Sequence, residues 1–227
     1  MRISVVIPVL NEAERINQVI EHIYRLNGDD IEIIVSDGAP GGTTISCIAD
    51  GRVIKVISEK GRGKQMNVGV AASTGDILLF LHADTLLPLG AFEKITAAMK
   101  SVRYAGGAFN LGIDSDRIFF RLIELAVAFR TRLTRIPYGD QAIFVRKEIF
   151  QGLGGFRDFP VMEDVELMRA IKGSGQRILI ISPKVRTSPR RWEKEGIVYC
   201  TLRNWMLIAL YLAGMSPDKL AKFYSSR

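Results

Sequence analysis

Short apolar runs rich in β-branched residues recur through the first third of the chain, and stretches with helical periodicity separate them. The runs cover residues 3–7, 31–36, 53–57 and 77–81. Runs of this length are typical of strands buried on both faces of a parallel sheet. Between the first two runs, residues 12–25 place their isoleucines and valine on one helical face, as in a crossover helix. The pattern therefore predicts an α/β fold with a doubly wound, mostly parallel sheet flanked by helices.

A second half of the chain begins near residue 104, where this pattern changes. Strand-like runs at 108–111, 142–146 and 178–181 alternate there with helical patterns at 116–133 and 163–172. An apolar helical stretch follows at 197–213 and is shorter than the roughly 20 residues of a membrane-spanning helix. No repeat, low-complexity stretch or linker divides the chain, so we expect residues 1–227 to form one domain.

The composition suits a globular protein with anionic partners. Hydrophobic residues make up 48% and charged residues 24% of the chain, which argues against a disordered or fibrous protein. The net charge of +7 favours partners such as nucleoside diphosphates or phospholipid surfaces. Nucleic acid is not expected, because aromatic residues are not interleaved with the basic ones. Cys47 and Cys200 have no paired spacing, which indicates a reducing compartment such as the cytoplasm.

Ligands of parallel α/β sheets bind beyond the carboxyl ends of the strands, where this chain carries polar residues and turn formers. These segments read VVIPVLNE at 5–12, IVSDG at 34–38, GRGKQMNVG at 61–69 and LFLHAD at 79–84. Later segments read GDQ at 139–141, GGF at 154–156, ED at 163–164 and RRW at 190–192. Together and in this order, they resemble the family 2 glycosyltransferases with the GT-A fold.

This resemblance implies a GT-A-like fold with two halves in one domain. A nucleotide-sugar half would cover residues 1–103 and an acceptor half 104–192, followed by a C-terminal helical segment at 193–227. The implied reaction is metal-dependent, inverting transfer of a sugar from a UDP- or GDP-sugar to an acceptor hydroxyl. The implied cofactor is manganese or magnesium, since a divalent cation neutralises the charge of the departing nucleoside diphosphate.

Two residues after the fourth strand are candidate metal ligands. Asp84 offers a hard carboxylate just past the predicted strand end, and the resemblance implies that it binds the metal. His82 stands where the family's motif usually has its first acid, so contact of His82 with the metal or the nucleotide stays open. The alternative is that both residues only shape a turn.

The nucleoside has candidate partners on the first two loops. By resemblance, Asp37 accepts a hydrogen bond from the base, and Pro8 and Glu12 on the first loop border the nucleoside. Asp37 could instead form a local turn before Gly38. Glu12 could equally stabilise the first turn of the helix that follows.

The glycine-rich segment 61–67 is a candidate phosphate cradle. It places Arg62, Lys64 and Asn67 beside a predicted helix start, where cations and backbone N–H groups favour anions. Gln65 follows the lysine where a P-loop has serine or threonine, so the segment is not a P-loop. A solvated basic loop is the alternative interpretation.

The acceptor needs a base that takes the proton of the attacking hydroxyl. The resemblance points to Asp164, with Glu163 as the alternate base, although both acids could instead stabilise a helix start. In the family's manner, Asp140 and Gln141 would line the acceptor side.

The segment 190–192 is expected at the edge of the same site. By resemblance, Arg190, Arg191 and Trp192 would close over the diphosphate or the acceptor. Ser188 stands where this motif often begins with glutamine, so processive polymer synthesis is not indicated.

Two other function classes remain open. A sugar nucleotidyltransferase would also use a metal and a basic loop, but its glycine-rich loop should follow the first strand, where residues 8–12 read PVLNE. A nonenzymatic module that binds a nucleotide or an anionic surface would not need Asp84 together with Glu163 and Asp164.

The helical pattern at 116–133 suggests a membrane contact. Its apolar residues include Phe119, Leu122, Leu125, Val127 and Phe129, and they are bordered by Arg117, Arg121, Arg130, Arg132 and Arg135. Residues 205–213 add a second apolar element, and both would suit an enzyme that is peripheral at the inner face of the membrane and uses a lipid-linked acceptor. The alternative, which we favour on sequence grounds, is that both helices bury their apolar faces in the core or in a homodimer interface.

Overall fold

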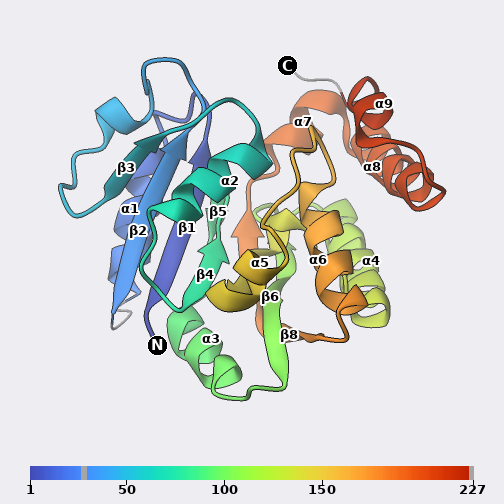
Figure 1. The fold of residues 1–227 in the computed structure, drawn as a ribbon. Coiled ribbons are helices and arrows are strands. Elements are labelled where there is room, and N and C mark those ends of the chain that lie inside the picture. The colour runs from blue at the N-terminus through green and yellow to red at the C-terminus, as the bar shows by residue number, and fades with distance from the viewer. Residues whose placement is uncertain (27–29, 225–227) are drawn as a thin grey trace.

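One eight-stranded sheet runs through the computed structural model, which describes residues 1–26 and 30–224 (Figure 1). The strands are β1 (Ile3–Val9), β2 (Ile31–Asp37), β3 (Ile54–Ile57), β4 (Ile77–Phe80), β5 (Thr85–Leu86), β6 (Tyr104–Ile113), β7 (Phe144–Arg146) and β8 (Arg177–Thr187). Their order in the sheet is β3-β2-β1-β4-β7-β6-β8-β5. Strands β3, β2, β1 and β4 are parallel, as are β6 and β8, whereas β7 is antiparallel to both of its neighbours and β5 to β8. The predicted α/β fold with a mostly parallel sheet is confirmed.

Helices cover both faces of this sheet. They are α1 (Ile16–Arg25), α2 (Arg62–Ala71), α3 (Ala91–Met99), α4 (Ile118–Thr134), α5 (Lys147–Gly152), α6 (Glu163–Gly173), α7 (Arg190–Glu195), α8 (Ile197–Leu212) and α9 (Pro217–Ala221), with 3₁₀ turns η1 (Ile45–Cys47) and η2 (Gly139–Gln141). Alternate residues of β1 point to opposite faces of the sheet. Val5 packs in one core cluster with side chains of α1 and α3, and Val6 packs in the other with side chains of α2, α5 and α6.

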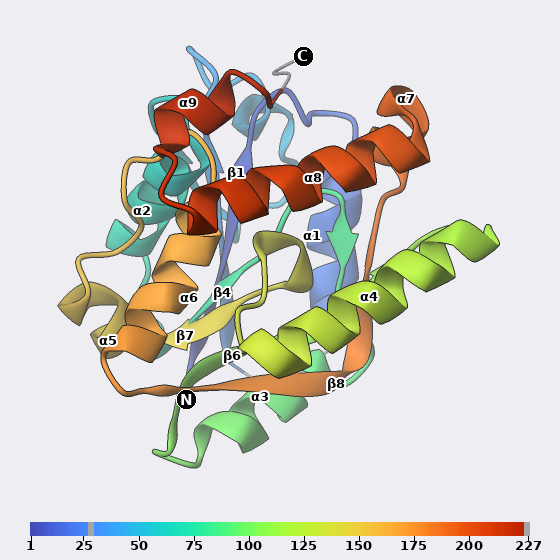
Figure 2. The same cartoon turned by 90° about the vertical axis from the view of Figure 1, so that its right-hand side faces the viewer.

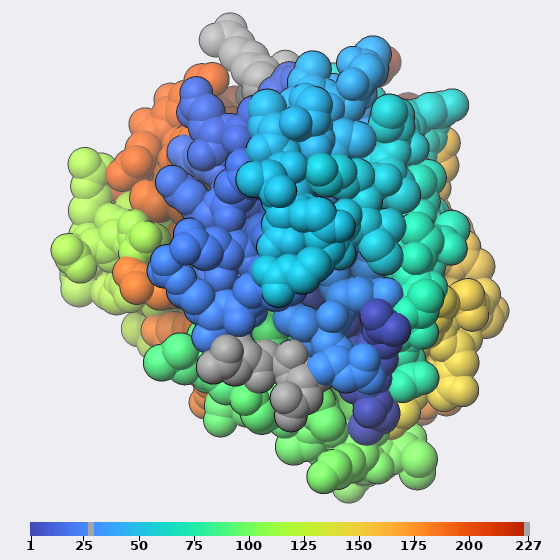
Figure 3. All heavy atoms as spheres, turned by 90° about the vertical axis from the view of Figure 1, so that its left-hand side faces the viewer, coloured from blue at the N-terminus to red at the C-terminus, as the bar shows by residue number. Residues whose placement is uncertain are grey.

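Two smaller clusters attach the later helices. Phe120 of α4 packs on Leu111 and Ile113 of β6, and α8 and α9 pack on α6 through Leu207, Leu220 and neighbouring side chains. Figure 2 shows α4 and α8 crossing one face of the molecule, and Figure 3 shows that the segments from β1 to α2 make up most of the opposite face.

Several local expectations were wrong. The helix predicted from residue 12 begins at Ile16, and Pro8, expected on the first loop, lies inside β1 opposite Ser36 of β2. Strand β3 is at the sheet edge and alternates between half-buried and exposed residues, so it is not buried on both faces.

Helices α4 and α8 also differ from the favoured interpretation. Most of their large apolar side chains are exposed, so burial of these faces in the core is wrong. Within the described residues, no helix is long and apolar enough to cross a membrane. Residues 27–29 of the predicted nucleotide-sugar half and 225–227 of the C-terminal segment lie outside the described residues.

Candidate active site

The carboxyl ends of β1 and β4 bring Glu12 and Asp84 to one arginine of α7. Arg190 Nη2 donates to Glu12 Oε1 over 3.0 Å and lies 3.9 Å from Asp84 Oδ2. Burial raises the pKa of Asp84, and Glu12 adds to this effect while Arg190 and Arg62 oppose it. The structure thus brings together three predicted site segments, of which the first and the last, at Glu12 and Arg190, are 178 residues apart in sequence.

Asp37, the last residue of β2, is fully buried and organises the loop that follows it. Its Oδ1 accepts from the N–H of Ala39 over 2.9 Å, and its Oδ2 accepts from the N–H groups of Thr44 and Ile45 over 2.7 and 3.2 Å. Thr44 Oγ1 in turn accepts from the N–H of Glu12. The carboxylate therefore fixes the loop beside Glu12, and its contact with a base stays a prediction.

Helix α2 is anchored to the same strand ends by Gln65, whose role the sequence analysis missed. Gln65 Nε2 donates to the carbonyls of Val9 and Ser36 over 2.6 and 3.0 Å. The amide of Gln65 also presses on Gly38, where a Cβ would lie 2.8 Å from its Cδ. No local signal in the sequence marks this role, because the two backbone partners of the amide lie 56 and 29 residues away along the chain.

The three predicted phosphate ligands of α2 point in different directions. Arg62 Nη1 lies 3.3 Å from Glu163 Oε1, inside the site. Lys64 Nζ instead pairs with the exposed carboxylates of Glu59 and Asp158 over 2.8 and 3.3 Å. Asn67 exchanges two hydrogen bonds with the backbone of Phe156, so its amide holds the 154–156 turn against α2. Arg62 is therefore the one of the three that faces the other site residues.

The start of α6 meets η2 at Asp164. Asp164 Oδ2 accepts from the N–H of Gly139 over 2.6 Å, and a Cβ on Gly139 would lie 3.0 Å from His82 Nε2 and 3.2 Å from Asp164 Oδ2. Burial and the charge of Arg62 lower the pKa of His82 to about 3, so its imidazole is neutral at pH 7. Asp164, Gly139 and His82 thus form a tight group beside Arg62.

Two more carboxylates of this group resist ionisation. Burial raises the pKa of Glu163; Arg62 opposes this effect, and the neighbouring Asp164 adds to it. Burial also raises the pKa of Asp140 to about 6, opposed by Arg130 and reinforced by Asp164 and Asp84. Carboxylates with pKa values raised by burial and by like charges are typical of functional sites.

Gln141 holds η2 against β6 and α4. It is fully buried, its Nε2 donates to the carbonyl of Phe109 over 2.9 Å, and its Oε1 accepts from Arg130 and Thr131 of α4 over 3.2 Å each. The guanidinium of Arg130 lies 3.3 Å from the centre of the Tyr138 ring. Arg130, which the sequence analysis placed beside an apolar surface, instead turns inward towards the loop that carries Asp140.

The segment 190–192 does not act as one unit. Arg191 Nη1 donates to the hydroxyl of Tyr224, whose contact with this segment was not predicted. Trp192 turns away from Arg190 and packs edge to face on Phe120 of α4, with ring centres 5.9 Å apart. Trp192 therefore belongs to the contact between α7 and α4, whereas Arg190 reaches Glu12 and Arg191 reaches Tyr224.

The carboxylate oxygens of Asp84, after β4, and of Asp140, on η2, are of the type that hard divalent cations prefer, whereas the neutral imidazole of His82 is a donor that suits transition metals. Asp140 Oδ1 is buried and has no hydrogen-bond partner, so it is free to meet a cation or a hydroxyl group. Over the described residues, no group of three or more acidic, histidine or cysteine side chains is already arranged around a metal position.

A family model and several relatives match the chain. The model described as glycosyl transferase family 2 matches residues 4–155. Glucosyl-3-phosphoglycerate synthase of Mycolicibacterium smegmatis is 32% identical over 96 residues, covering 38% of this chain and 32% of that protein. The probable glycosyltransferase YdaM of Bacillus subtilis is 27% identical over 226 residues, covering 86% of this chain and 51% of that protein. The chain thus spans about a third to a half of the length of these relatives.

Solved structures share the fold. TarS 1-349 of S. aureus in complex with UDP-GlcNAc superimposes with a TM-score of 0.63 at 16% identity, over 83% of this chain and 58% of that one. The mannosyltransferase PcManGT from Pyrobaculum calidifontis, in complex with GDP-Man and Mn²⁺, gives 0.61 at 24% identity, over 82% and 56% of the two chains.

Proposed function

Because the chain belongs to glycosyl transferase family 2, we propose that it transfers a sugar from a nucleotide sugar to an acceptor hydroxyl, with inversion at the anomeric carbon. The observation that carries this proposal is the convergence of Asp84, Arg62 and Asp164 from three distant segments on one edge of the sheet. A carboxylate for a cation, a guanidinium for phosphate and a base for a hydroxyl are the groups that this reaction needs.

The donor side would be formed by the strand ends. Arg62, Arg190 and Arg191 would bind the diphosphate, and Pro8, Glu12 and Asp37 would border the nucleoside of a UDP- or GDP-sugar. Asp84 would hold manganese or magnesium, with His82 as a further candidate ligand, and the cation would neutralise the leaving diphosphate. The structures with UDP-GlcNAc and with GDP-Man and Mn²⁺ support this type of donor and cofactor.

The acceptor side would be formed by η2 and the start of α6. Asp164 is the proposed base, because its carboxylate is held by the N–H of Gly139 next to the free oxygen of Asp140. Glu163 is the alternate base, although its pairing with Arg62 ties it to the donor side. One base and direct displacement are consistent with inversion.

The wider assignments belong to the same proposal. Residues 1–103, 104–192 and 193–227 would act as one domain with donor, acceptor and C-terminal segments in the cytoplasm. A lipid-linked acceptor at the inner face of the membrane fits the exposed apolar sides of α4 and α8, and a homodimer is the alternative that would cover them. Family membership favours glycosyl transfer over nucleotidyl transfer and over a nonenzymatic binding module.

Ligand-induced thermal stabilisation tests the donor assignment. A ligand that binds only the native state raises the melting temperature, by an amount that grows with its concentration relative to Kd. We expect a nucleoside diphosphate or nucleotide sugar to raise Tm with manganese and to raise it less with a chelator. If no nucleotide in a panel shifts Tm under either condition, the proposed donor site is wrong.

A further inference from the structure

The outward sides of α4 and α8 form an exposed apolar surface, here called the α4–α8 face. From α4 it includes Ile118, Phe119, Leu122, Leu125, Phe129 and Leu133, each between 57% and 74% exposed. From α8 it includes Val198, Tyr199, Leu202, Trp205, Met206 and Leu212, each between 45% and 63% exposed. Figure 2 shows both helices on the same side of the molecule. Exposed apolar patches of this extent mark interaction sites in proteins.

Helix α4 exposes an apolar stripe that an ordinary surface helix would bury. Ile118, Leu122, Leu125, Phe129 and Leu133 follow each other at intervals of three or four residues, so they share one outward stripe. The side turned to the protein carries the buried Phe120, which packs on β6, together with the buried Glu124 and Thr131 and the inward-facing Arg130. The helix therefore presents to its surroundings a stripe of the kind that would normally face a core.

The charges around this face favour an anionic partner. Glu124 is the only acid of α4, and it is buried between Arg121 and Lys184, whereas α8 contains no acidic residue. Arg117 before α4, and Arg132 and Arg135 at its end, are exposed. Exposed acids border the face at Asp114 and Asp116 before α4 and at Glu193 of α7, but none lies on the outward sides of α4 or α8. An apolar helix surface of this kind, flanked by arginines, has the pattern of helices that lie in the interface of an anionic bilayer.

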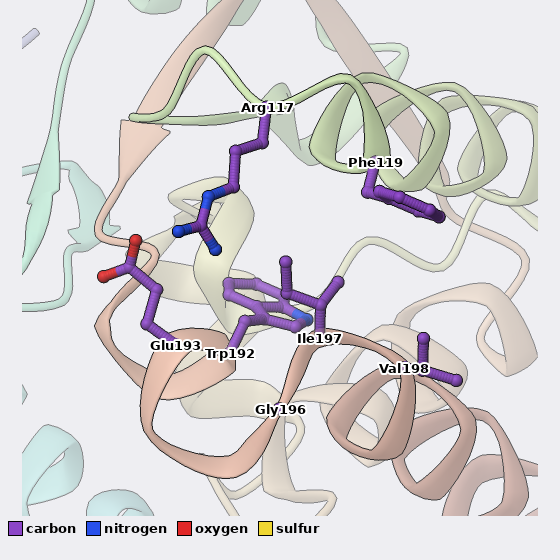
Figure 4. A pocket seen from close by; sticks show the side chains of 7 residues that line it. All are labelled: Arg117, Phe119, Trp192, Glu193, Gly196, Ile197 and Val198. Atoms are coloured by element: carbon purple, nitrogen blue, oxygen red, sulfur yellow. The ribbon is translucent and has the colours of Figure 1, made fainter.

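A recess lies where the first turns of the two helices approach each other. This pocket of about 300 Å³ is lined by Arg117 and Phe119 on one side and by Trp192, Glu193, Gly196, Ile197 and Val198 on the other (Figure 4). Its apolar walls suit a lipid chain, whereas the carboxylate of Glu193 offsets the charge of Arg117, so the recess itself does not select an anionic headgroup.

The same charges disfavour self-association through this face. In a twofold symmetric dimer, one patch packs against its own copy. The outward sides of both helices lack carboxylates, so the flanking arginines of one copy would find acidic partners only outside α4 and α8, such as Asp116 and Glu193 of the other copy. A bilayer with anionic headgroups provides the complementary charge.

We propose that the α4–α8 face docks the protein on an anionic bilayer and thereby presents a lipid-borne acceptor to the site. Helix α4 separates this face from the acceptor side, since its inward residues Arg130 and Thr131 contact Gln141 next to Asp140. A helix with its side chains is about 10 Å thick, which a headgroup extending from the bilayer can span. The acceptor part of this proposal rests on the proposed function, whereas the docking part does not.

Vesicle sedimentation with matched variants tests the docking. The double variant Leu125→Glu/Phe129→Glu changes two residues of the face, and the control Leu89→Glu/Val102→Glu changes two exposed apolar residues elsewhere. With phosphatidylglycerol-containing vesicles at low salt, we expect the wild type and the control to sediment and the face variant to lose at least about tenfold in partitioning. Binding should weaken with salt and in Arg132→Glu/Arg135→Glu.

Tryptophan fluorescence adds a readout of the face itself. Trp205 is half exposed on α8, so its emission should shift to the blue with anionic vesicles and be quenched by brominated lipid, and Trp205→Phe should remove most of this signal. No sedimentation of the wild type at low salt, or equal loss in the face variant and the control, would overturn the proposal. Concentration-dependent dimerisation abolished by Leu125→Glu/Phe129→Glu, without vesicle binding, would assign the face to self-association instead.

Donor hydrolysis separates this proposal from the proposed function. Release of nucleoside diphosphate from a nucleotide sugar, measured without vesicles, should be the same in the wild type and the face variant. Vesicle binding without any such release would support the docking and reject the enzyme assignment. Release without vesicle binding would support the enzyme assignment and reject the docking.

Discussion

At the scale of single residues, the site is organised by backbone contacts of its acids. Asp37 holds the N–H groups of its loop, and Asp164 holds the N–H of Gly139. These bonds fix where a carboxylate stands without using all of its lone pairs, because each oxygen can accept more than one hydrogen bond. An acid that shapes its loop can therefore still meet a ligand.

The base assignment predicts the behaviour of Asp164→Asn. The amide keeps the size and one acceptor oxygen of the side chain, so the fold and donor binding should be retained. Turnover should fall by roughly 10²- to 10⁴-fold, as expected when a general base is lost. Steady-state kinetics with the native acceptor, or donor hydrolysis with water, measures the change.

Glu163→Gln is the matched variant for this test. Glu163 is paired with Arg62, so its loss should weaken donor binding more than it slows the chemical step. Near-normal turnover of Asp164→Asn together with a large loss in Glu163→Gln would move the base to Glu163.

The residues that sequence reasoning missed share a cause. Gln65, Arg130 and Tyr224 make contacts over sequence distances that no local pattern encodes, such as the bond from Arg191 to Tyr224. Motifs located the strand-end acids, because parallel strands place their carboxyl ends on one edge. The direction of Lys64, Asn67 and Trp192 could not be predicted, since it depends on which neighbours the fold brings to them.

At the scale of elements, close backbone contacts position β6 between its neighbours. A Cβ on Gly106 would lie 2.2 Å from the carbonyl oxygen of Phe144 in β7, and one on Gly107 would lie 2.3 Å from that of Leu179 in β8. The sequence pattern predicted a strand at 108–111, whereas β6 begins at Tyr104 and contains both glycines. The helix and strand periods were recognised because they are local, whereas the outward orientation of α4 depends on what surrounds it.

Gly106→Ala should therefore destabilise the protein, because backbone atoms cannot move aside as a flexible side chain can. We expect the free energy of unfolding to fall by about 1 to 3 kcal/mol, as for overpacked cores. Gly152→Ala in α5 is the control, since its Cβ would meet nothing within 4 Å, and it should be neutral or stabilise by up to about 1 kcal/mol. Equal denaturation midpoints for the two variants would contradict this explanation of β6.

A buried carboxylate ties β1, β2 and the turn before β4 together. Glu32 accepts hydrogen bonds from Ser4 Oγ, from Thr74 N and Oγ1, and from Gly75 N, at distances of 2.5 to 3.0 Å. Burial alone would raise the pKa of Glu32, but these bonds outweigh it and lower the pKa below its usual 4.5. The charged form is therefore the one that the folded protein stabilises.

This lowered pKa predicts a pH-dependent effect of Glu32→Gln. The stabilisation is present above pH 4.5 and is lost as the pH falls through the lower folded-state pKa. The variant should lose about 1 to 3 kcal/mol at pH 7, and the difference from wild type should shrink below about pH 4. Urea unfolding at pH 7 and below about pH 4 measures this difference in stability. Glu21→Gln, at an exposed position, is the control and should change stability little. A difference between Glu32→Gln and wild type that does not depend on pH would contradict the lowered pKa.

At the scale of the whole molecule, the proposed donor side lies at the carboxyl ends of the parallel strands, and the proposed acceptor side lies where β7 and β6 meet α4 and α6. This arrangement explains why residues from Glu12 to Arg190 must fold together before any of the proposed chemistry is available. Helix α4 lies between the exposed α4–α8 face and the residues around Asp140, since its inward-facing Arg130 contacts Gln141.

The most direct test of the proposed reaction is an assay for nucleoside diphosphate release. The protein is incubated with nucleotide sugars and manganese, and water serves as the acceptor. The wild type should release it slowly from at least one UDP- or GDP-sugar, and release should fall to background with a chelator and in Asp84→Ala, which should remain folded because Asp84 lies on a loop outside the core. No release from any nucleotide sugar, or undiminished manganese-dependent release by folded Asp84→Ala, would contradict the assignment of this edge of the sheet as a metal-dependent donor site.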